Sequence, residues 1–212
     1  GLESHQREKM DEIELALAAQ KGDLNSFNRL VLEYQEMAFN LAYRMLGDPD
    51  SAADATQNAF ISAYKAISGY RGGSFKSWVM RIVSNTCLDE IRRQKRRPTT
   101  PLEPFDPEGE EEIESPTWLR DENPSPEEVL ESSELEGAIQ NCLQSMKQDF
   151  RLVVVLVDIQ GMDYQEVSDS TGLPLGTIKS RLARARGKLR ECLQFFRELL
   201  PDIFRLEGEG IQ

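Results

Sequence analysis

The chain has 212 residues, of which 39% are hydrophobic and 29% charged, and a formal net charge of −12. This composition is ordinary for a folded globular protein and argues against a disordered chain. No apolar run is long enough to span a bilayer, and the polar segment 1–11 lacks the apolar centre of a signal peptide. We therefore expect a cytoplasmic protein with no direct membrane insertion, divided into two small domains.

The first domain is predicted to be helical and to span residues 11–97. Apolar residues in the segment 27–45 recur at three- and four-residue steps, which is typical of an amphipathic helix. Asp50 or Ser51 can cap the next helix, and Ser74 can cap a third one after a glycine-rich loop. The expected helices are 11–20, 27–45, 51–67 and 74–97.

The stretch 98–131 is predicted to be an acidic, flexible linker. From Pro98 to Glu136 there are fourteen Asp and Glu residues against one basic residue, Arg120, and seven of the ten prolines of the chain. Such a segment cannot bury enough apolar surface to offset the entropy lost on ordering. The rest of the chain is close to neutral, so the net charge does not exclude nucleic-acid binding. The alternative interpretation is that this stretch is only a flexible tether and that its negative charge has no role.

The second domain is predicted to span residues 132–196, and no role is assigned to the tail 197–212. Val153–Val157 is rich in β-branched residues and could form a strand, but its helical neighbours favour a buried helix. The fold class is therefore all-α, with two helical domains. The expected helices of this part are 135–146, 150–159, 164–170 and a long one that begins near Leu175.

A helix-turn-helix is the strongest local signal of the sequence. A short helix, the turn Thr171–Leu173 with its glycine, and a longer basic helix follow one another. Between Leu175 and Arg190 there are six basic residues and no acidic one. Arg and Lys can hold guanine edges and phosphates, whereas a solvated amphipathic helix with no DNA role is the alternative. The apolar face of the long helix is formed by Ile178, Leu182, Ala185 and Leu189.

A second basic cluster, at residues 92–97, ends the first domain. It favours nucleic-acid contact, although pairing with the helix C-terminal dipole would also explain it. Upstream on the same helix lie Phe75, Trp78 and Asn85. Aromatic rings at helical spacing usually belong to a core, yet rings, an amide and arginines are also what unpaired bases need for stacking, hydrogen bonds and phosphate contacts.

No catalytic centre, cofactor site or metal site is expected. The lone histidine, His5, offers no partner for acid-base chemistry, so an enzyme is disfavoured. The cysteines Cys87, Cys142 and Cys192 are far apart and form no CxxC pair. We expect them to be reduced, mostly buried thiols that bind no metal.

These motifs together resemble the extracytoplasmic-function (ECF) family of RNA polymerase sigma factors over about residues 11–196. In the first domain the residues similar to region 2 of that family are 54–60 (DATQNAF), 69–72 (GYRG), 77–82 (SWVMRI) and Asn85. In the second domain the residues similar to region 4 are 163–167 (DYQEV), 174–181 (PLGTIKSR) and 183–186 (ARAR).

The resemblance implies the function of a sigma factor, which directs promoter-specific initiation of transcription and helps to open the DNA. For docking on the clamp helices of the polymerase β′ subunit it implies Asp54, Gln57 and Phe60. For the −10 element it implies Tyr70, Arg71, Phe75, Trp78, Asn85, Arg92, Arg93 and Arg96. For the −35 element it implies Thr177, Lys179, Ser180, Arg181, Arg184, Arg186 and Lys188.

The partners implied by the resemblance are core RNA polymerase, through its β′ clamp helices and its β subunit, promoter DNA and an anti-sigma factor. A one-component regulator with a helix-turn-helix is the alternative function. Such a regulator would carry a ligand pocket or phosphoacceptor site in its first domain, and it would not need to bind core polymerase.

Overall fold

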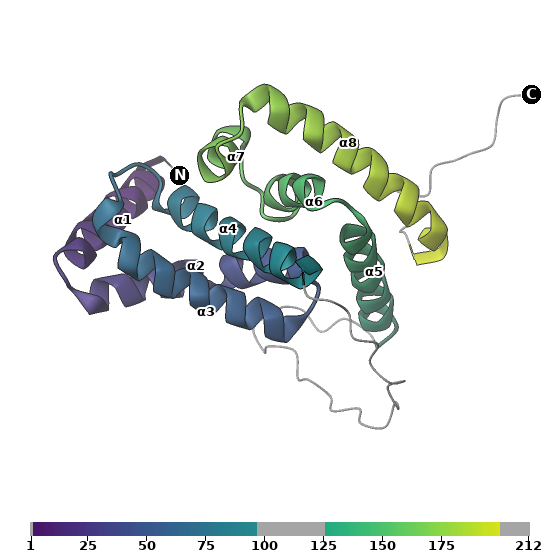
Figure 1. Cartoon of the computed structure of the whole chain (residues 1–212), viewed down its shortest axis with the longest axis horizontal. Helices are drawn as coiled ribbons and strands as arrows, with labels where there is room; N and C mark the ends of the chain where they lie inside the picture. Colours follow the sequence, from purple (N-terminus) through teal and green to yellow (C-terminus); the bar gives the residue numbers. More distant parts are fainter. Residues whose placement is uncertain (1, 97–125, 200–212) are drawn as a thin grey trace, which may run out of the picture.

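The elements of this protein are all helical in the part of the chain that the structure describes (Figure 1). The computed structural model describes residues 2–96 and 126–199, with side chains placed for residues 11–96 and 133–196. The prediction of an all-α fold with two domains is confirmed. Most of the predicted linker and the tail beyond residue 199 lie outside the described residues.

The first domain is a bundle in which the short turns are fixed by caps. Its helices are α1 (Leu2–Gln20), α2 (Leu24–Leu46), α3 (Pro49–Ala66), the 3-10 turn η1 (Ile67–Gly69) and α4 (Phe75–Arg96). The Asp48 carboxylate accepts the Ser51 backbone N–H at 2.7 Å, and Pro49 occupies the first turn of α3. The cap of this helix is therefore Asp48, and neither of the predicted caps, Asp50 and Ser51.

The second domain begins with α5 (Pro126–Ser145), so its first helix starts inside the stretch predicted to be linker. Its other elements are α6 (Gln148–Val154), the π-helical turn η3 (Val155–Ile159), α7 (Tyr164–Thr171), α8 (Leu175–Leu193) and η4 (Gln194–Leu199). The β-branched stretch 153–157 is helical and almost entirely buried, as predicted. This buried segment forms the centre against which α8 packs through Ile178, Leu182 and Ala185.

The two domains are packed against each other through the end of α2. The guanidinium of Arg151, on α6, donates from Nη1 to the Met45 backbone carbonyl and from Nη2 to the Gln144 and Met146 carbonyls at 2.9 Å. The amides of Gln140 and Gln144, on α5, donate to the carbonyls of Tyr43 and Arg44. The carbonyls of the last turn of α2 are thus capped by the other domain, and the Tyr43 carbonyl also accepts the backbone N–H of Gly47, the C-cap of α2.

The expectation of three reduced thiols is wrong for two of the cysteines. Cys142 on α5 and Cys192 at the end of α8 form a disulfide, and their sequence separation is 50 residues. Cys87 is free and buried, and burial together with the nearby charge of Glu90 raises the pKa of its thiol to about 12. Two cysteines far apart in sequence meet here because α5 and α8 pack side by side.

The disulfide is expected to stabilise the second domain. A loop of this length restricts the unfolded chain by about 4 kcal/mol in the chain-entropy description. We predict that a dithiol reductant lowers the free energy of unfolding of the second domain by about that amount, measured by denaturant titration. The Cys142→Ser/Cys192→Ser chain should not respond to the reductant, and an unchanged unfolding midpoint of the native chain would contradict the prediction.

Candidate nucleic-acid interface

The helix-turn-helix is formed by α7, a three-residue turn and α8. The Asp163 carboxylate accepts the Glu166 backbone N–H, while the Glu166 carboxylate accepts the Asp163 backbone N–H, so a capping box begins α7. Gly172 ends this helix with a φ of +73°, a left-handed conformation that glycine adopts without a steric cost. The hydroxyl of Ser168 donates to the Leu173 carbonyl across the turn. These bonds fix the angle at which α8 leaves α7.

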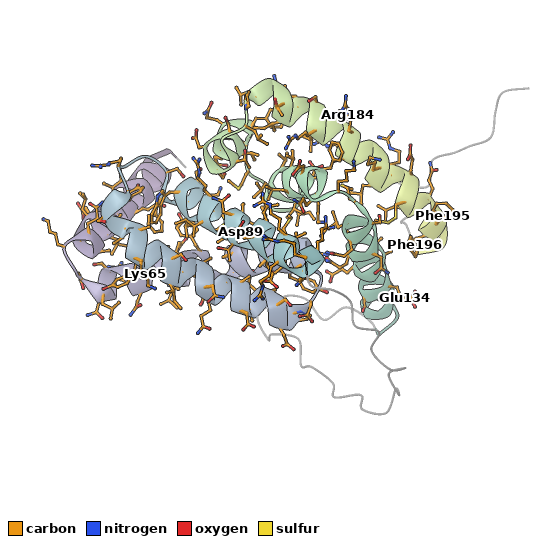
Figure 2. The ribbon with its side chains drawn as sticks, viewed as in Figure 1. Lys65, Asp89, Glu134, Arg184, Phe195 and Phe196 are labelled. Atoms are coloured by element: carbon orange, nitrogen blue, oxygen red, sulfur yellow. A yellow bond between two sulfur atoms is a disulfide. The ribbon has the colours of Figure 1, made fainter. Side chains whose placement is uncertain are left out.

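One face of α8 is exposed and basic. Ile178, Leu182 and Ala185 are buried, as predicted, whereas Lys179, Ser180, Arg184, Arg186 and Lys188 are exposed and Thr177 and Arg181 are half-buried. Figure 2 shows Arg184 on the outer edge of α8. The sequence periodicity therefore assigned the buried and exposed faces of this helix correctly.

The basic residues of α8 differ in their partners within the chain. Arg186 donates to both carboxylate oxygens of Asp158, at 2.9 and 2.6 Å, and this hydrogen bonding raises the pKa of its guanidinium. Arg181 lies 3.9 Å from the carboxylate of Asp149. Lys179 is stacked above the ring of Tyr164, with 6.0 Å between its Nζ and the ring centroid. Two of the seven predicted −35 residues are therefore oriented by carboxylates of the same domain.

The predicted −10 residues fall into a buried aromatic group and an exposed polar group. Tyr70 is 5% exposed and Phe75 is 1% exposed, and the half-buried ring of Trp78 lies 5.5 and 5.3 Å from theirs, centroid to centroid. The hydroxyl of Tyr70 donates to the Gly73 carbonyl at 2.7 Å, which ties the loop to the cluster. Tyr70 and Phe75 thus support the ring of Trp78 from behind, and their faces are packed against protein.

The exposed polar group consists of Arg71, Asn85, Arg92, Arg93 and Arg96. Arg92 pairs with Asp89 and Arg93 pairs with Glu90, both at 2.7 Å, and Figure 2 marks Asp89 on this part of α4. These are surface pairs between neighbouring turns, which contribute little to stability and exchange readily with phosphate. The basic end of α4 is therefore free to contact an anionic partner.

An apolar groove lies between α2 and α3, on the same domain. It has a volume of about 890 Å³, and Gln57 and Phe60 are among the residues that line it, whereas Asp54 is exposed on the same helix and is not part of the lining. The sequence reasoning missed Leu32 and Ile61, which are 66% and 47% exposed in this groove. Their signal was an apolar side chain outside the predicted buried stripe of each helix.

The described residues contain no group of histidine, cysteine or acidic side chains that could hold a metal ion. None of the described helices is long and apolar enough to cross a membrane. The fold and the exposed basic faces together define a DNA-binding protein with two helical modules.

Sequence families identify both modules. The family Sigma-70 region 2 matches residues 30–97, and the family Sigma-70, region 4 matches residues 136–189. The ECF RNA polymerase sigma-E factor of Escherichia coli K12 is 35% identical over 188 residues, which cover 88% of this chain and 96% of that protein. The RNA polymerase sigma-H factor of Pseudomonas aeruginosa is 34% identical over 182 residues, covering 85% and 93% respectively.

The chain also resembles a longer relative and two solved structures. It is 35% identical over 168 residues to the ECF sigma factor SigE of Mycolicibacterium smegmatis, and these residues cover 79% of this chain and 62% of that protein. The structure of CnrH in complex with the cytosolic domain of CnrY matches with a TM-score of 0.62, at 24% identity over 87% of this chain and 97% of that one. The RpoE sigma factor of Bartonella quintana matches with a TM-score of 0.60, at 20% identity over 81% and 98%.

The chain belongs to the ECF family of RNA polymerase sigma factors. It is a promoter-specific transcription initiation factor and has no enzymatic activity of its own. The match of the first domain to region 2 displaces the alternative of a one-component regulator, because region 2 belongs to sigma factors.

The predicted −10 residues include buried side chains, which stabilise the fold, and exposed ones, which do not. We predict that Phe75→Ala lowers the free energy of unfolding by about 3–5 kcal/mol, because a fully buried ring is lost. Asn85→Ala, at an exposed position, should change it by less than about 0.5 kcal/mol. Denaturant titration of the two variants checks both values, and equal destabilisation would contradict the assignment of Phe75 to the core.

Proposed function

We propose that the exposed face of α8 reads the −35 element. Lys179, Ser180 and Arg184 form the part directed at base edges, because they project away from the buried stripe. Arg181, Arg186 and Lys188, with Thr177 at the start of the helix, contact the phosphates that flank them. Arg186 would exchange Asp158 for a phosphate on binding, so Asp158 orients this guanidinium before DNA arrives.

We propose that α4 and the loop before it receive the unpaired −10 strand. Trp78 offers a ring that is only half-buried, and Asn85 offers an exposed amide for base edges on the same helix. Arg71, Arg92, Arg93 and Arg96 neutralise the phosphates. Tyr70 and Phe75 act through Trp78, whose ring they hold in place.

The apolar groove between α2 and α3 is the surface we propose for the clamp helices of core polymerase. An exposed apolar groove of this size usually marks a protein interface. A helix could bury its apolar side against Leu32, Phe60 and Ile61 while Gln57 and Asp54 supply polar contacts at the rim. The second domain would meet the polymerase β subunit.

We further propose a cytoplasmic location and an anti-sigma partner for this chain. CnrH was solved with the cytosolic domain of CnrY, and the Bartonella quintana sigma factor with the anti-sigma factor NepR. Because the clamp groove of this chain is exposed and apolar, a partner that covers it would compete with core polymerase.

The exposed basic face of α8 is the main observation that supports the proposed recognition of the −35 element. We predict that Arg184→Ala spares stability but weakens discrimination between promoter variants, because one base contact is worth about 1–3 kcal/mol. Arg186→Ala should instead weaken binding to all sequences alike and reduce the salt slope by about one unit. Binding of the holoenzyme to a selected duplex and to its single-base variants, at two salt concentrations, measures both effects.

The two arginines serve as controls for each other, since they lie on one helix and carry the same charge. Equal, sequence-independent losses in both variants would show that the assigned facing of α8 is wrong. Arg186→Ala also frees the Asp158 carboxylate, so Asp158→Asn supplies a matched control for that change.

The clamp groove gives a separate test through run-off transcription with core polymerase. Leu32→Asp places a charge on an exposed apolar residue of the groove, and we predict at least a tenfold loss of affinity for core polymerase, with a matching loss of transcript. Ser62→Asp, at an exposed position of α3 that does not line the groove, should retain both. Equal transcript from the two variants would contradict the proposed docking surface.

A further inference from the structure

The last residue of α1 is bonded to the segment that leads into α4. The side-chain amide of Gln20 donates from Nε2 to the Ile67 carbonyl at 2.9 Å and to the Tyr70 carbonyl at 2.7 Å. A glutamine amide has two N–H donors, so one is available for each carbonyl. Ile67 begins the turn η1, and Tyr70 is the residue that follows it. Gln20 therefore fixes the point at which the chain leaves η1 and enters the loop before α4.

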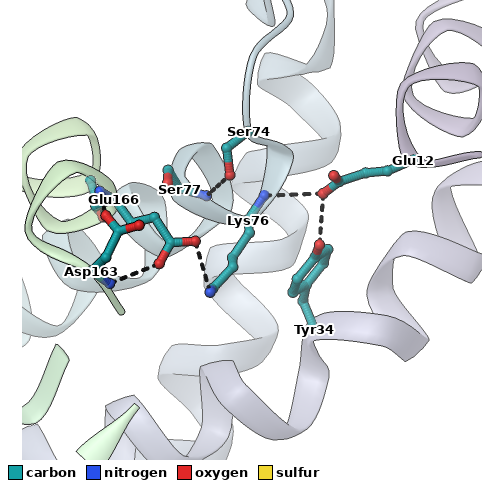
Figure 3. A network of polar contacts seen from close by, with 8 residues as sticks. Glu12, Tyr34, Ser74, Lys76, Ser77, Asp163 and Glu166 are labelled. Atoms are coloured by element: carbon teal, nitrogen blue, oxygen red, sulfur yellow. Dashed lines mark hydrogen bonds and ion pairs between the residues drawn. The ribbon is translucent and has the colours of Figure 1, made fainter. Parts of the chain in front are cut away.

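A second side chain of α1 holds the other end of this loop. The Glu12 carboxylate accepts the backbone N–H of Lys76 at 3.2 Å and the hydroxyl of Tyr34 at 2.6 Å (Figure 3). Lys76 lies in the first turn of α4, where a backbone N–H has no carbonyl partner within the helix. Burial, together with the bond to Glu12, raises the pKa of the Tyr34 hydroxyl, so it keeps its proton and donates. Together with Ser74, whose Oγ accepts the Ser77 N–H, Glu12 caps the start of α4.

The helix α1 can hold both ends of the loop because it packs closely and ends in a fixed turn. Ala16 and Ala19 are buried, and their small side chains let the helix backbone lie close to its neighbours. After Gln20, the backbone N–H of Asp23 donates to the Ala18 carbonyl at 3.1 Å. Asp23 is also the N-cap of α2. The end of α1, and with it the half-buried Gln20, is thus fixed relative to the rest of the domain.

The loop between these two anchors contains two adjacent glycines. Gly72 and Gly73 have φ values of +89° and +87°, and glycine gives the backbone more freedom than any other residue. The Tyr70 hydroxyl bond to the Gly73 carbonyl crosses the loop, and Arg71 is exposed at its outer side. Ordering a loop at the moment of binding weakens binding, because the lost conformational entropy has to be offset. Anchors at both ends reduce the entropy that remains to be lost.

We propose that Gln20 and Glu12 are positioning residues for recognition of the −10 element. They preorganise the loop 70–74 and the first turn of α4, so that Arg71 and Trp78 meet the unpaired strand in a fixed geometry. The proposal rests on the −10 role proposed above for α4 and its loop. Both side chains act through the backbone that they hold, so α1 takes part in promoter recognition without touching DNA.

Binding of the reconstituted holoenzyme to two DNA probes measures this role. The first probe carries the −35 element as a duplex and the −10 strand unpaired, and the second is the same duplex without the −10 strand. The ratio of the two affinities isolates the contribution of the −10 strand. Gln20→Met keeps the size and the neutral charge of the side chain but removes both donors, and it should lower this ratio about tenfold. An unchanged ratio, or an equal loss of affinity for both probes, would overturn the proposal.

Asn25→Leu is the matched control, because it also replaces a side-chain amide by an apolar group of similar size. Asn25 is exposed in the first turn of α2 and does not line the groove proposed for core polymerase. This variant should therefore keep the native ratio of affinities. A loss in Asn25→Leu as large as that in Gln20→Met would show that the effect is not specific to the loop anchor, and it would refute the positioning role.

Glu12 supplies a second pair of variants, equal in charge, which decides the proposal even where Gln20→Met does not fold. Glu12→Gln keeps a side-chain oxygen that can accept the Lys76 N–H, whereas Glu12→Met does not. The ratio of affinities should be about fivefold higher for Glu12→Gln than for Glu12→Met, since one hydrogen bond separates the two variants at this helix end. Equal ratios would contradict the proposal.

Hydrogen–deuterium exchange of the free chain tests the same idea without DNA. The Tyr70 N–H donates to the Ile67 carbonyl at 3.1 Å and reports whether η1 is closed. Gln20→Met should raise the exchange rate of this amide about tenfold, while the amide of Ala59, buried in α3, exchanges as in the native chain. An equal rise at both amides would indicate a general loss of stability, and no rise at Tyr70 would show that Gln20 does not anchor the loop; either result would overturn the proposal.

Trp78→Ala and Asn85→Ala separate failure of this proposal from failure of the proposed −10 function. Both remove side chains assigned to the unpaired strand, so each should lower the ratio of affinities for the two probes. If they lower it while Gln20→Met and Glu12→Met do not, the positioning role fails and the −10 function of α4 stands. If they leave the ratio unchanged, the −10 function of α4 fails, and this proposal fails with it.

Discussion

The buried guanidinium of Arg151 is the contact on which the arrangement of the two domains depends. It lies where the C-terminal ends of α2 and α5 converge, and it donates to carbonyls at both ends. The negative ends of two helix dipoles stabilise the cation there, and no carboxylate among the described residues pairs with it. Arg151 thus holds the turn between α5 and α6 in place within its own domain, and it also holds that domain against α2. Removing either helix end would leave a buried cation with too few acceptors, so the fold of the second domain and its docking are linked through one side chain.

The distribution of charge explains how an acidic chain can read DNA. The excess negative charge is concentrated in residues 98–136, which join the domains and include the first turns of α5, whereas α8 and the end of α4 present exposed arginines and lysines. Carboxylates next to these helices, such as Asp158 and Asp89, hold individual arginines in defined positions. Each pair is exposed and therefore weak, so a phosphate can replace the carboxylate at small cost. The acidic residues on the folded domains orient the basic side chains more than they oppose DNA.

The sequence predicted what depends on periodicity and local geometry. The apolar stripe of α8 and the glycine turn before it follow from spacing, and the helical state of the β-branched segment 153–157 follows from its helical neighbours. The contacts between distant elements did not follow. The Cys142–Cys192 disulfide requires α5 and α8 to be adjacent, and the spacing of the two cysteines carries no sign of that. The docking of the domains uses an arginine and two glutamines at the end of α2 and the Lys76–Glu166 pair between α4 and α7, and these residues leave no periodic pattern. The rings of Phe75 and Trp78 were open to either a core or a base-stacking interpretation, and only the packed geometry shows that Phe75 is buried and Trp78 half-buried.

The first domain divides its two proposed roles between different helices. The first turn of α4 carries the aromatic support and the pair with α7, its middle carries Asn85, and its end carries the basic cluster. The groove proposed for core polymerase is instead lined by residues of α2 and α3. Because the exposed residues that line the groove are not on α4, a substitution such as Leu32→Asp can alter one proposed surface and leave the side chains of the other in place. The apolar core that these helices share holds the two surfaces at a fixed distance within one domain.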